Sequence, residues 1–333
     1  MSETGDTNTS FCQVNDNYKH KVYAAVYSIV FTVGFCCNIL ALYVFYKFAK
    51  RKSATTVYLI SLAMADLLLI ISLPFRIAYF HSGGVWIFGD VICRVCTFLL
   101  YFSMYTSIYL LTCISVSRCL IVIRLNILRP RKILIICAAV WLFVGASTIP
   151  FTFLGTQVRD NITRCFEPSG EKLWTSVFYM NYYAFIIGFI IPFIMIITSY
   201  GIIIKQMMKT DRSKRKNRKD KAMIILIPAT FCLCFLPYHI QRTVHLHYFF
   251  YHRKTCEIHE ALEKSVVATL CLAVANCCFD PLLYVFLGQG FRRLWKPLLC
   301  RTAEISQASS SSGNNNQTVV NTTVAADTEM TPL

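Results

Sequence analysis

Seven long apolar stretches constrain this chain more than any other feature of its sequence. They cover residues 22–46, 53–75, 95–117, 133–158, 173–204, 222–241 and 265–291. Two of these stretches contain one acidic residue each, Asp66 and Asp280, and the others contain no charged residue. A helix needs about 20 apolar residues to cross a bilayer, whereas the strands of a membrane barrel alternate over about 10 residues. The pattern predicts an all-α membrane protein, a bundle of seven transmembrane helices.

The composition excludes the soluble alternatives. Only 15% of the residues are charged and 56% are hydrophobic, whereas about 25% of the residues in a soluble domain are charged. So few charges could not solvate the surface of a soluble enzyme of 333 residues. The sequence also lacks the HExxH and GxSxG motifs of membrane hydrolases. We therefore expect a membrane protein that is not an enzyme.

The distribution of basic residues predicts the orientation in the membrane. Of the 33 Lys and Arg residues, 22 fall in four segments on one side of the bundle: 47–52, 118–132, 205–221 and 292–301. Cytoplasmic loops carry an excess of Lys and Arg, so this side is predicted to be cytoplasmic and the N-terminus extracellular. The net charge of +16 then reflects topology and attraction to anionic lipid, and we expect no nucleic acid partner.

Four segments follow from this pattern. Residues 1–21 form a polar extracellular N-terminus, for which we expect no cleaved signal peptide, and 22–291 form the seven-helix domain. Residues 292–301 have the spacing of an amphipathic helix on the membrane surface. Residues 302–333, rich in Ser, Thr and Asn, are predicted to be a disordered cytoplasmic tail.

Two kinds of covalent modification are predicted from short motifs. Asn8 and Asn161 begin Asn-x-Ser/Thr sequons on the predicted outer side, where glycosylation occurs. Cys300, next to the predicted surface helix, is a candidate for palmitoylation.

Four of the sixteen cysteines are predicted to lie on the oxidising side: Cys12, Cys93, Cys165 and Cys256. Four cysteines allow three pairings. We favour Cys93–Cys165 together with Cys12–Cys256. The alternative is one disulfide and two free thiols.

Short motifs recur in the predicted helices. They are Gly34-Phe-Cys-Cys-Asn38, Leu62-Ala-Met-Ala-Asp66, Ser117-Arg118-Cys119, Trp141, Pro192, Tyr200, Phe231-Cys-Leu-Cys-Phe-Leu-Pro237 and Asp280-Pro-Leu-Leu-Tyr284. Together with a Cys at the start of the third helix, they resemble the rhodopsin-like (class A) G-protein-coupled receptors over residues 22–300. Five positions depart from the usual family residues: Cys37 replaces Gly, Ser117 replaces Asp, Cys119 replaces Tyr, Phe235 replaces Trp, and Asp280 replaces Asn.

Longer segments narrow the resemblance. Residues 164–168, 236–247 and 276–284 are similar to the cysteinyl leukotriene receptors, and to the type 1 receptors more than to type 2. This resemblance implies a cysteinyl leukotriene ligand and a heterotrimeric G protein, with Gq and calcium mobilisation expected. The alternatives are a receptor of the same branch for nucleotides or another anionic lipid. A transporter is also an alternative, but the predicted helices show no inverted repeat.

Candidate ligand-binding residues lie near the outer ends of the predicted helices. By family resemblance they converge on one cavity: Tyr27, Arg76, Tyr101, Tyr105, Tyr238, His239 and Arg242. Arg binds carboxylates bidentately, and Tyr offers apolar area with a hydroxyl group. Such a set favours an anion with a long apolar body. In the alternative interpretation the Arg side chains extend to the membrane interface and the Tyr residues form an interfacial belt.

The two acids within the apolar stretches predict a second site. Asn276 lies one helical turn before Asp280, and the family resemblance adds Ser107 opposite Asp66. Oxygen ligands of this kind suit a small hard cation, so we predict an allosteric Na⁺ site and no other cofactor. The alternative is a protonated, hydrogen-bonded cluster without an ion.

The family resemblance also implies a set of residues that transmit activation. They are Ile108, Arg118, Pro192, Tyr200, Phe231, Phe235 and Tyr284. Because Ser117 cannot form an ion pair with Arg118, we expect a weak resting lock at this position.

Overall fold

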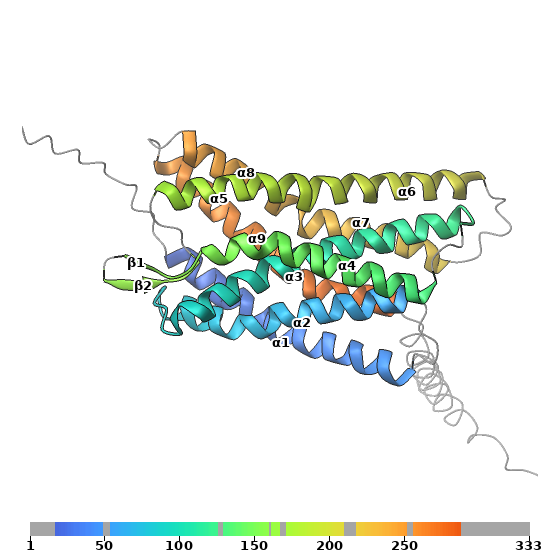
Figure 1. The fold of residues 1–333 in the computed structure, drawn as a ribbon, viewed down its shortest axis with the longest axis horizontal. Helices are drawn as coiled ribbons and strands as arrows, with labels where there is room; N and C mark the ends of the chain where they lie inside the picture. Colours follow the sequence, from blue (N-terminus) through green and yellow to red (C-terminus); the bar gives the residue numbers. More distant parts are fainter. Residues whose placement is uncertain are drawn as a thin grey trace, which may run out of the picture.

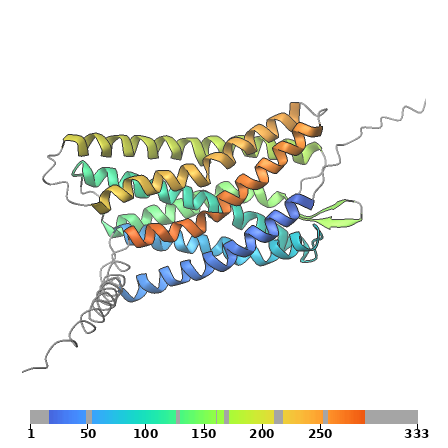
Figure 2. The same cartoon turned by 180° about the vertical axis from the view of Figure 1, so that it is seen from behind.

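The computed structural model describes residues 17–48, 54–125, 129–159, 161–166, 171–209, 218–251 and 256–287. They form an elongated bundle of long helices that run back and forth along one axis (Figures 1 and 2). The helical elements are α1 (Asn17–Phe48), α2 (Ala54–His81), α3 (Gly89–Val122), α4 (Pro130–Thr148), η1 (Ile149–Phe153), α5 (Glu171–Tyr183), η2 (Ala184–Ile190), α6 (Ile191–Lys209), α7 (Arg218–Cys234), α8 (Leu236–Tyr251) and α9 (Cys256–Leu287). We call the end where α1 begins the N-terminal end of the bundle.

The described helices cross the bundle seven times. Six continuous helical segments are long and apolar enough to span a membrane. The remaining crossing consists of α7 and α8, which are separated by a break at Phe235. Pro237 explains this break, because it has no N–H to donate to the carbonyl group of Leu233. The predicted seven-helix fold is therefore confirmed.

Several helices extend beyond the apolar stretches that predicted them. For example, α1 begins at Asn17 and α8 ends at Tyr251. Apolar length marks only the part of a helix inside the hydrocarbon layer, and a helix can continue beyond it because its backbone hydrogen bonds are internal. The fourth apolar stretch, 133–158, is instead longer than its helix at the C-terminal end, because α4 ends at Thr148. Pro150 stops the α-helix there, and Val158 lies in a strand instead.

A short π-helix, η2, lies between α5 and α6 and packs against α3. The Tyr109 hydroxyl donates a hydrogen bond of 2.7 Å to the Ile187 carbonyl within η2. Gly188 faces the ring of Tyr105 so closely that an added Cβ would lie 2.6 Å from its Cε1 atom. A π-helical turn often marks a functional position, and this one fixes Tyr105 in the bundle interior.

A β-hairpin projects from the N-terminal end of the bundle (Figure 1). It pairs β1 (Gln157–Arg159) with β2 (Ile162–Arg164) in antiparallel register, with Val158 opposite Thr163. These strands were not predicted from the sequence. The hairpin precedes Cys165, whose disulfide to Cys93 ties it to the start of α3.

Candidate functional site

Arg76 lies in the interior of the bundle near its N-terminal end. Its side chain is only 3% exposed. The Nη2 atom donates a hydrogen bond of 2.9 Å to the Cys96 carbonyl on α3. Among the residues that the structure describes, no carboxylate pairs with Arg76 and its Nε atom has no hydrogen-bond partner. Arg76 is therefore a buried cation with unused hydrogen-bonding capacity, and it does not extend to the membrane interface.

Aromatic rings surround the Arg76 guanidinium group. Its Cζ atom lies 3.9 Å from the centre of the Phe166 ring. Phe166 in turn contacts Tyr79 and Trp86 edge-on, with ring centres 5.5 Å apart in each case. Phe166 was not predicted from the sequence; its one local signal is its position directly after Cys165.

The predicted Tyr27 lies next to Arg76. Tyr27 is buried, and its hydroxyl group interacts electrostatically with the guanidinium. Tyr23, one helical turn earlier on α1, stacks on Tyr27 with ring centres 5.2 Å apart. Tyr23 was not predicted, although its spacing of four residues from Tyr27 was a usable signal.

Arg242 on α8 lies among the remaining predicted tyrosines. Its charge interacts with the hydroxyl groups of Tyr101, Tyr238 and Tyr105, and also with that of Tyr23. Tyr105 and Tyr238 are buried, and Arg242 is partly buried. The two arginines and their tyrosines thus face one region, and Tyr23 interacts with both groups.

His239 connects this region to the predicted activation residues. Its Nδ1 atom lies 2.9 Å from the Phe235 carbonyl, so Nδ1 carries the proton and Nε2 is an acceptor in neutral His239. The imidazole stacks on Phe189 at 4.5 Å between ring centres. Phe189 stacks on Phe231 at 5.5 Å, and Phe231 contacts Phe235 at 5.6 Å. A continuous aromatic column therefore runs from His239 to the break between α7 and α8.

The predicted cation-binding residues form a buried polar cluster near the middle of the bundle. Asp66 accepts hydrogen bonds from Ser107 and Tyr284, each 3.4 Å long. Asn276 donates a hydrogen bond of 2.7 Å to Asp280. One oxygen atom of Asn276 and one of Asp280 have no hydrogen-bond partner in the described part of the chain. Asp66, Ser107 and Asn276 line a cavity with room for about one water-sized particle.

The remaining activation residues have contacts of their own in the bundle. Arg118 donates a weak hydrogen bond of 3.5 Å to Thr55, while Ser117 donates to the Tyr58 hydroxyl at 3.3 Å. The charge of Arg118 also interacts with the Tyr200 hydroxyl. The single O–H of Tyr284 is instead shared between oxygen atoms of Asp66 and Asn38, at 3.4 and 3.2 Å. Ile108 and Pro192 are buried in the core.

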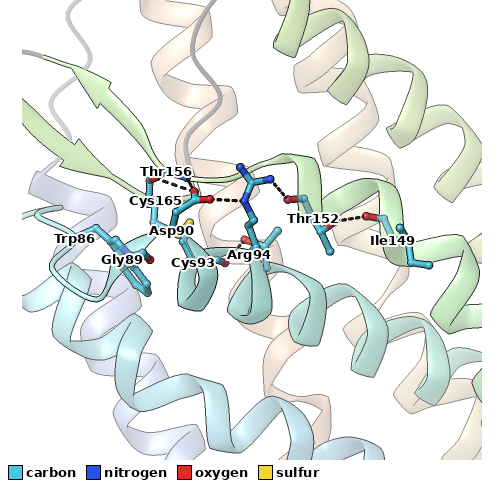
Figure 3. Close-up of polar contacts among 10 residues, drawn as sticks. Trp86, Gly89, Asp90, Cys93, Arg94, Ile149, Thr152, Thr156 and Cys165 are labelled. Carbon is cyan, nitrogen blue, oxygen red and sulfur yellow. Dashed lines mark hydrogen bonds and ion pairs between the residues drawn. A yellow bond between two sulfur atoms is a disulfide. The ribbon is translucent and has the colours of Figure 1, made fainter.

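A disulfide and a polar clamp attach the connection between α4 and α5 to α3 (Figure 3). The disulfide joins Cys93 and Cys165, whose Cα atoms are 5.9 Å apart; this predicted pairing is confirmed. The polar clamp is formed by Asp90 and Arg94. Asp90 accepts hydrogen bonds from the backbone N–H and side chain of Thr156, at 2.7 and 2.9 Å, and Arg94 donates to the Thr152 carbonyl at 2.8 Å.

Removing the clamp is expected to loosen this connection. Asp90→Ala breaks the contacts to Thr156 and the ion pair with Arg94. It should lower the free energy of unfolding by about 1.5–3 kcal/mol, the range for hydrogen bonds to a charged group. Thermal unfolding of the purified protein measures this loss. Glu260→Ala is the matched control, because it removes another i,i+4 ion pair, with Lys264, on a different helix, α9. Equal effects of the two variants would show that the clamp adds nothing beyond an exposed ion pair.

Of the residues predicted to be modified or disulfide-bonded, some lie outside the described part of the chain. Asn8, Cys12 and Cys300 lie outside the described residues, so the Cys12–Cys256 disulfide remains a prediction. Asn161 is exposed and stands at the turn of the β-hairpin.

Seven membrane crossings, a buried cation at one end and a buried polar cluster at mid-depth define the class of seven-helix membrane receptors. The family model of the 7 transmembrane receptor (rhodopsin family) matches residues 37–284. The chain belongs to this rhodopsin family of receptors and is a multi-pass membrane protein.

Within this family, the chain is similar to several receptors for lipid ligands. The chain is 41% identical to cysteinyl leukotriene receptor 1 of Cavia porcellus, over 88% of this chain and 90% of that receptor. It is 36% identical to cysteinyl leukotriene receptor 2 of Homo sapiens, over 88% of this chain and 86% of the relative. It is also 37% identical to lysophosphatidic acid receptor 6 of Gallus gallus, over 84% of this chain and 94% of that relative.

Proposed function

We propose that this protein is a receptor for cysteinyl leukotrienes, which bind near Arg76 and activate a G protein at the opposite end of the bundle. Support comes from the high similarity to cysteinyl leukotriene receptors over most of the chain. The observation that carries the proposal is the burial of Arg76 without an acidic partner in the described ranges. A buried, uncompensated cation is costly, and an anionic ligand would compensate it.

The other residues of the site fit the rest of such a ligand. A cysteinyl leukotriene joins a carboxylate-bearing peptide group to a long unsaturated lipid chain. Arg242 offers a second cation beside Tyr101 and Tyr238. Tyr27, Tyr105 and His239 add buried aromatic surface for the lipid chain.

A panel of agonists in expressing cells tests the ligand class. Calcium mobilisation should respond to a cysteinyl leukotriene at far lower concentrations than to a nucleoside diphosphate or lysophosphatidic acid. Lysophosphatidic acid belongs in the panel because a receptor named for it is among the relatives. A stronger response to the nucleotide or to lysophosphatidic acid would replace the proposal with the corresponding alternative. Blocking Gq selectively in the same assay tests the expected G protein.

The N-terminal end is proposed to be extracellular and the opposite end cytoplasmic. This assignment rests on the 22 basic residues in the four segments on the opposite side. In this orientation Asn8 and Asn161 are glycosylation sites, and Cys300 is at the cytoplasmic surface, where palmitoylation takes place. Glycosidase treatment of intact cells, with Asn8→Gln and Asn161→Gln as controls, tests the orientation.

Activation is proposed to pass along the aromatic column from His239 to Phe231. A ligand that displaces His239 would shift Phe189 and Phe231, which stack on one another. Because α7 and α8 meet at Phe235, a shift there would swing α7. The hydrogen bond from Arg118 to Thr55, at 3.5 Å, is weak and offers little resistance to this movement.

The polar cluster around Asp66 is proposed to bind an allosteric Na⁺ ion. The cavity lined by Asp66, Ser107 and Asn276 supports this, as do the unpartnered oxygen atoms of Asn276 and Asp280. Carboxylate, hydroxyl and amide oxygens suit a hard cation.

Asp66→Asn is therefore expected to abolish the sensitivity of agonist affinity to Na⁺. Agonist binding is measured in NaCl and in choline chloride at equal ionic strength. Ser72→Ala serves as the control, because Ser72 is buried on the same helix and bonds to the Leu69 carbonyl instead. If Asp66→Asn keeps the wild-type difference between the two salts, the cluster does not bind Na⁺.

A further inference from the structure

Phe166 has an unusual backbone conformation directly above Arg76. Its φ angle is 69°, in the left-handed region. For a bulky side chain this conformation is an outlier that costs about 1–3 kcal/mol, and such strain concentrates at ligand-binding positions. The surrounding structure must hold Phe166 in this conformation.

The residues that precede Phe166 in the chain are held in place by several contacts. Cys165, the residue before it, is fully buried and joined to Cys93. The β-hairpin leads into Cys165, and the Thr163 carbonyl accepts a hydrogen bond of 2.8 Å from the Trp86 backbone N–H. The Asp90 clamp holds the start of the same connection at Thr156. These attachments leave Phe166 little freedom to move away from Arg76.

The position of the Phe166 ring restricts how Arg76 can bind an anion. The guanidinium Cζ lies over the Phe166 ring, 3.9 Å from its centre, and this cation–π contact restricts how the guanidinium can turn. The hydrogen bond from Nη2 to the Cys96 carbonyl fixes the plane from a second direction. Hydrogen bonds from a guanidinium lie in its plane. The N–H edge, including the unpartnered Nε, is therefore the part of the guanidinium with hydrogen bonds still to form.

We propose that Phe166 is a positioning residue that holds the Arg76 guanidinium edge-on toward one carboxylate of the ligand. Planar, bidentate pairing requires this alignment, and it selects a planar carboxylate. This inference rests on the proposed function, because it assigns Phe166 a role in cysteinyl leukotriene binding.

Comparing ligands that differ only in the charge of one group distinguishes a positioning role of Phe166 from a purely structural one. The probes are the cysteinylglycine-conjugated leukotriene and two derivatives in which one or the other carboxylic acid is replaced by a primary amide. The ratio of acid to amide affinity measures how much the charged pairing contributes. Loss of positioning reduces this ratio for one carboxylate, whereas general damage to the loop weakens acid and amide equally.

Phe166→Leu removes the ring but retains a similar apolar volume and the same backbone cost. We expect it to weaken binding of the acid by about fivefold to thirtyfold, the range of a buried cation–π contact, and to reduce the acid-to-amide ratio for one carboxylate. Phe166→Tyr retains the ring and should restore both values to within about threefold of wild type. Phe88→Leu is the matched control: Phe88 packs against Trp86 and Phe75 in the same aromatic group. It should leave the ratio unchanged.

Competition binding at matched surface expression gives all of these values. An unchanged ratio in Phe166→Leu, with acid and amide weakened equally or not at all, would overturn the positioning role. If wild type itself shows no saturable leukotriene binding, the proposed function fails instead. If Phe166→Leu does not reach the surface, Arg76→Lys is tested instead, alone and combined with Phe166→Tyr. Lys cannot form the bidentate pair, so the ratio of acid to amide affinity should be low in both variants. A ratio equal to that of wild type would also overturn the positioning role.

Discussion

Arg76→Ala is expected to weaken binding of a cysteinyl leukotriene by about 2–5 kcal/mol, because a ligand carboxylate would lose its partner in a poorly solvated site. Arg76 is 3% exposed, and the structure places no acid against it in the described ranges. The ligand would therefore be its main source of charge compensation. Agonist affinity at matched surface expression is the quantity to measure.

Arg76→Lys separates this prediction from a simpler membrane-anchor role. Lys keeps the charge but cannot form the planar bidentate pair, so it should recover only part of the lost affinity. An anchor role predicts that Lys replaces Arg fully and that Ala affects expression more than affinity. If Lys equals Arg and Ala loses less than about tenfold, or roughly 1.4 kcal/mol, Arg76 does not bind the ligand carboxylate.

Cys93→Ser or Cys165→Ser is expected to remove most of the receptor from the cell surface. Losing a native disulfide typically costs about 2–5 kcal/mol, and this bond anchors the hairpin and Phe166. The double variant should be no worse than either single variant, because one bond is lost in each case. Cys36→Ser is the control, since Cys36 is a free, exposed cysteine. A double variant with clearly additive loss would mean that the cysteines act separately.

Mass spectrometry of the non-reduced protein extends this test to the other predicted pair. We expect a Cys12–Cys256 peptide alongside the Cys93–Cys165 peptide. A Cys12–Cys165 peptide would refute both assignments.

The membrane-spanning part of the fold was predictable because its signal is local. Each crossing needs about 20 apolar residues, so every crossing could be counted in the sequence, including the one that breaks at Phe235. Acids within apolar helices are costly enough to need a reason. That rule singled out Asp66 and Asp280, which lie in one buried cluster with Ser107 and Tyr284.

The parts that could not be predicted depend on contacts between distant residues. Phe166 is important only because its ring lies over Arg76, and no local pattern connects the two. The hairpin has strands of three residues each, too short for a detectable alternation. The π-helix likewise depends on Tyr109 and Tyr105 of α3 packing against Ile187 and Gly188.

Equilibrium binding of a tritiated cysteinylglycine-conjugated leukotriene to the purified receptor tests the central claim most directly. The structure and its relatives predict saturable binding that the unlabelled leukotriene displaces and that a nucleoside diphosphate does not. Arg76→Ala, purified in the same way and shown by thermal unfolding to be folded, should lose most of this binding. The contrary result is a folded wild-type receptor that shows no saturable binding, or one from which the nucleoside diphosphate displaces the label equally well.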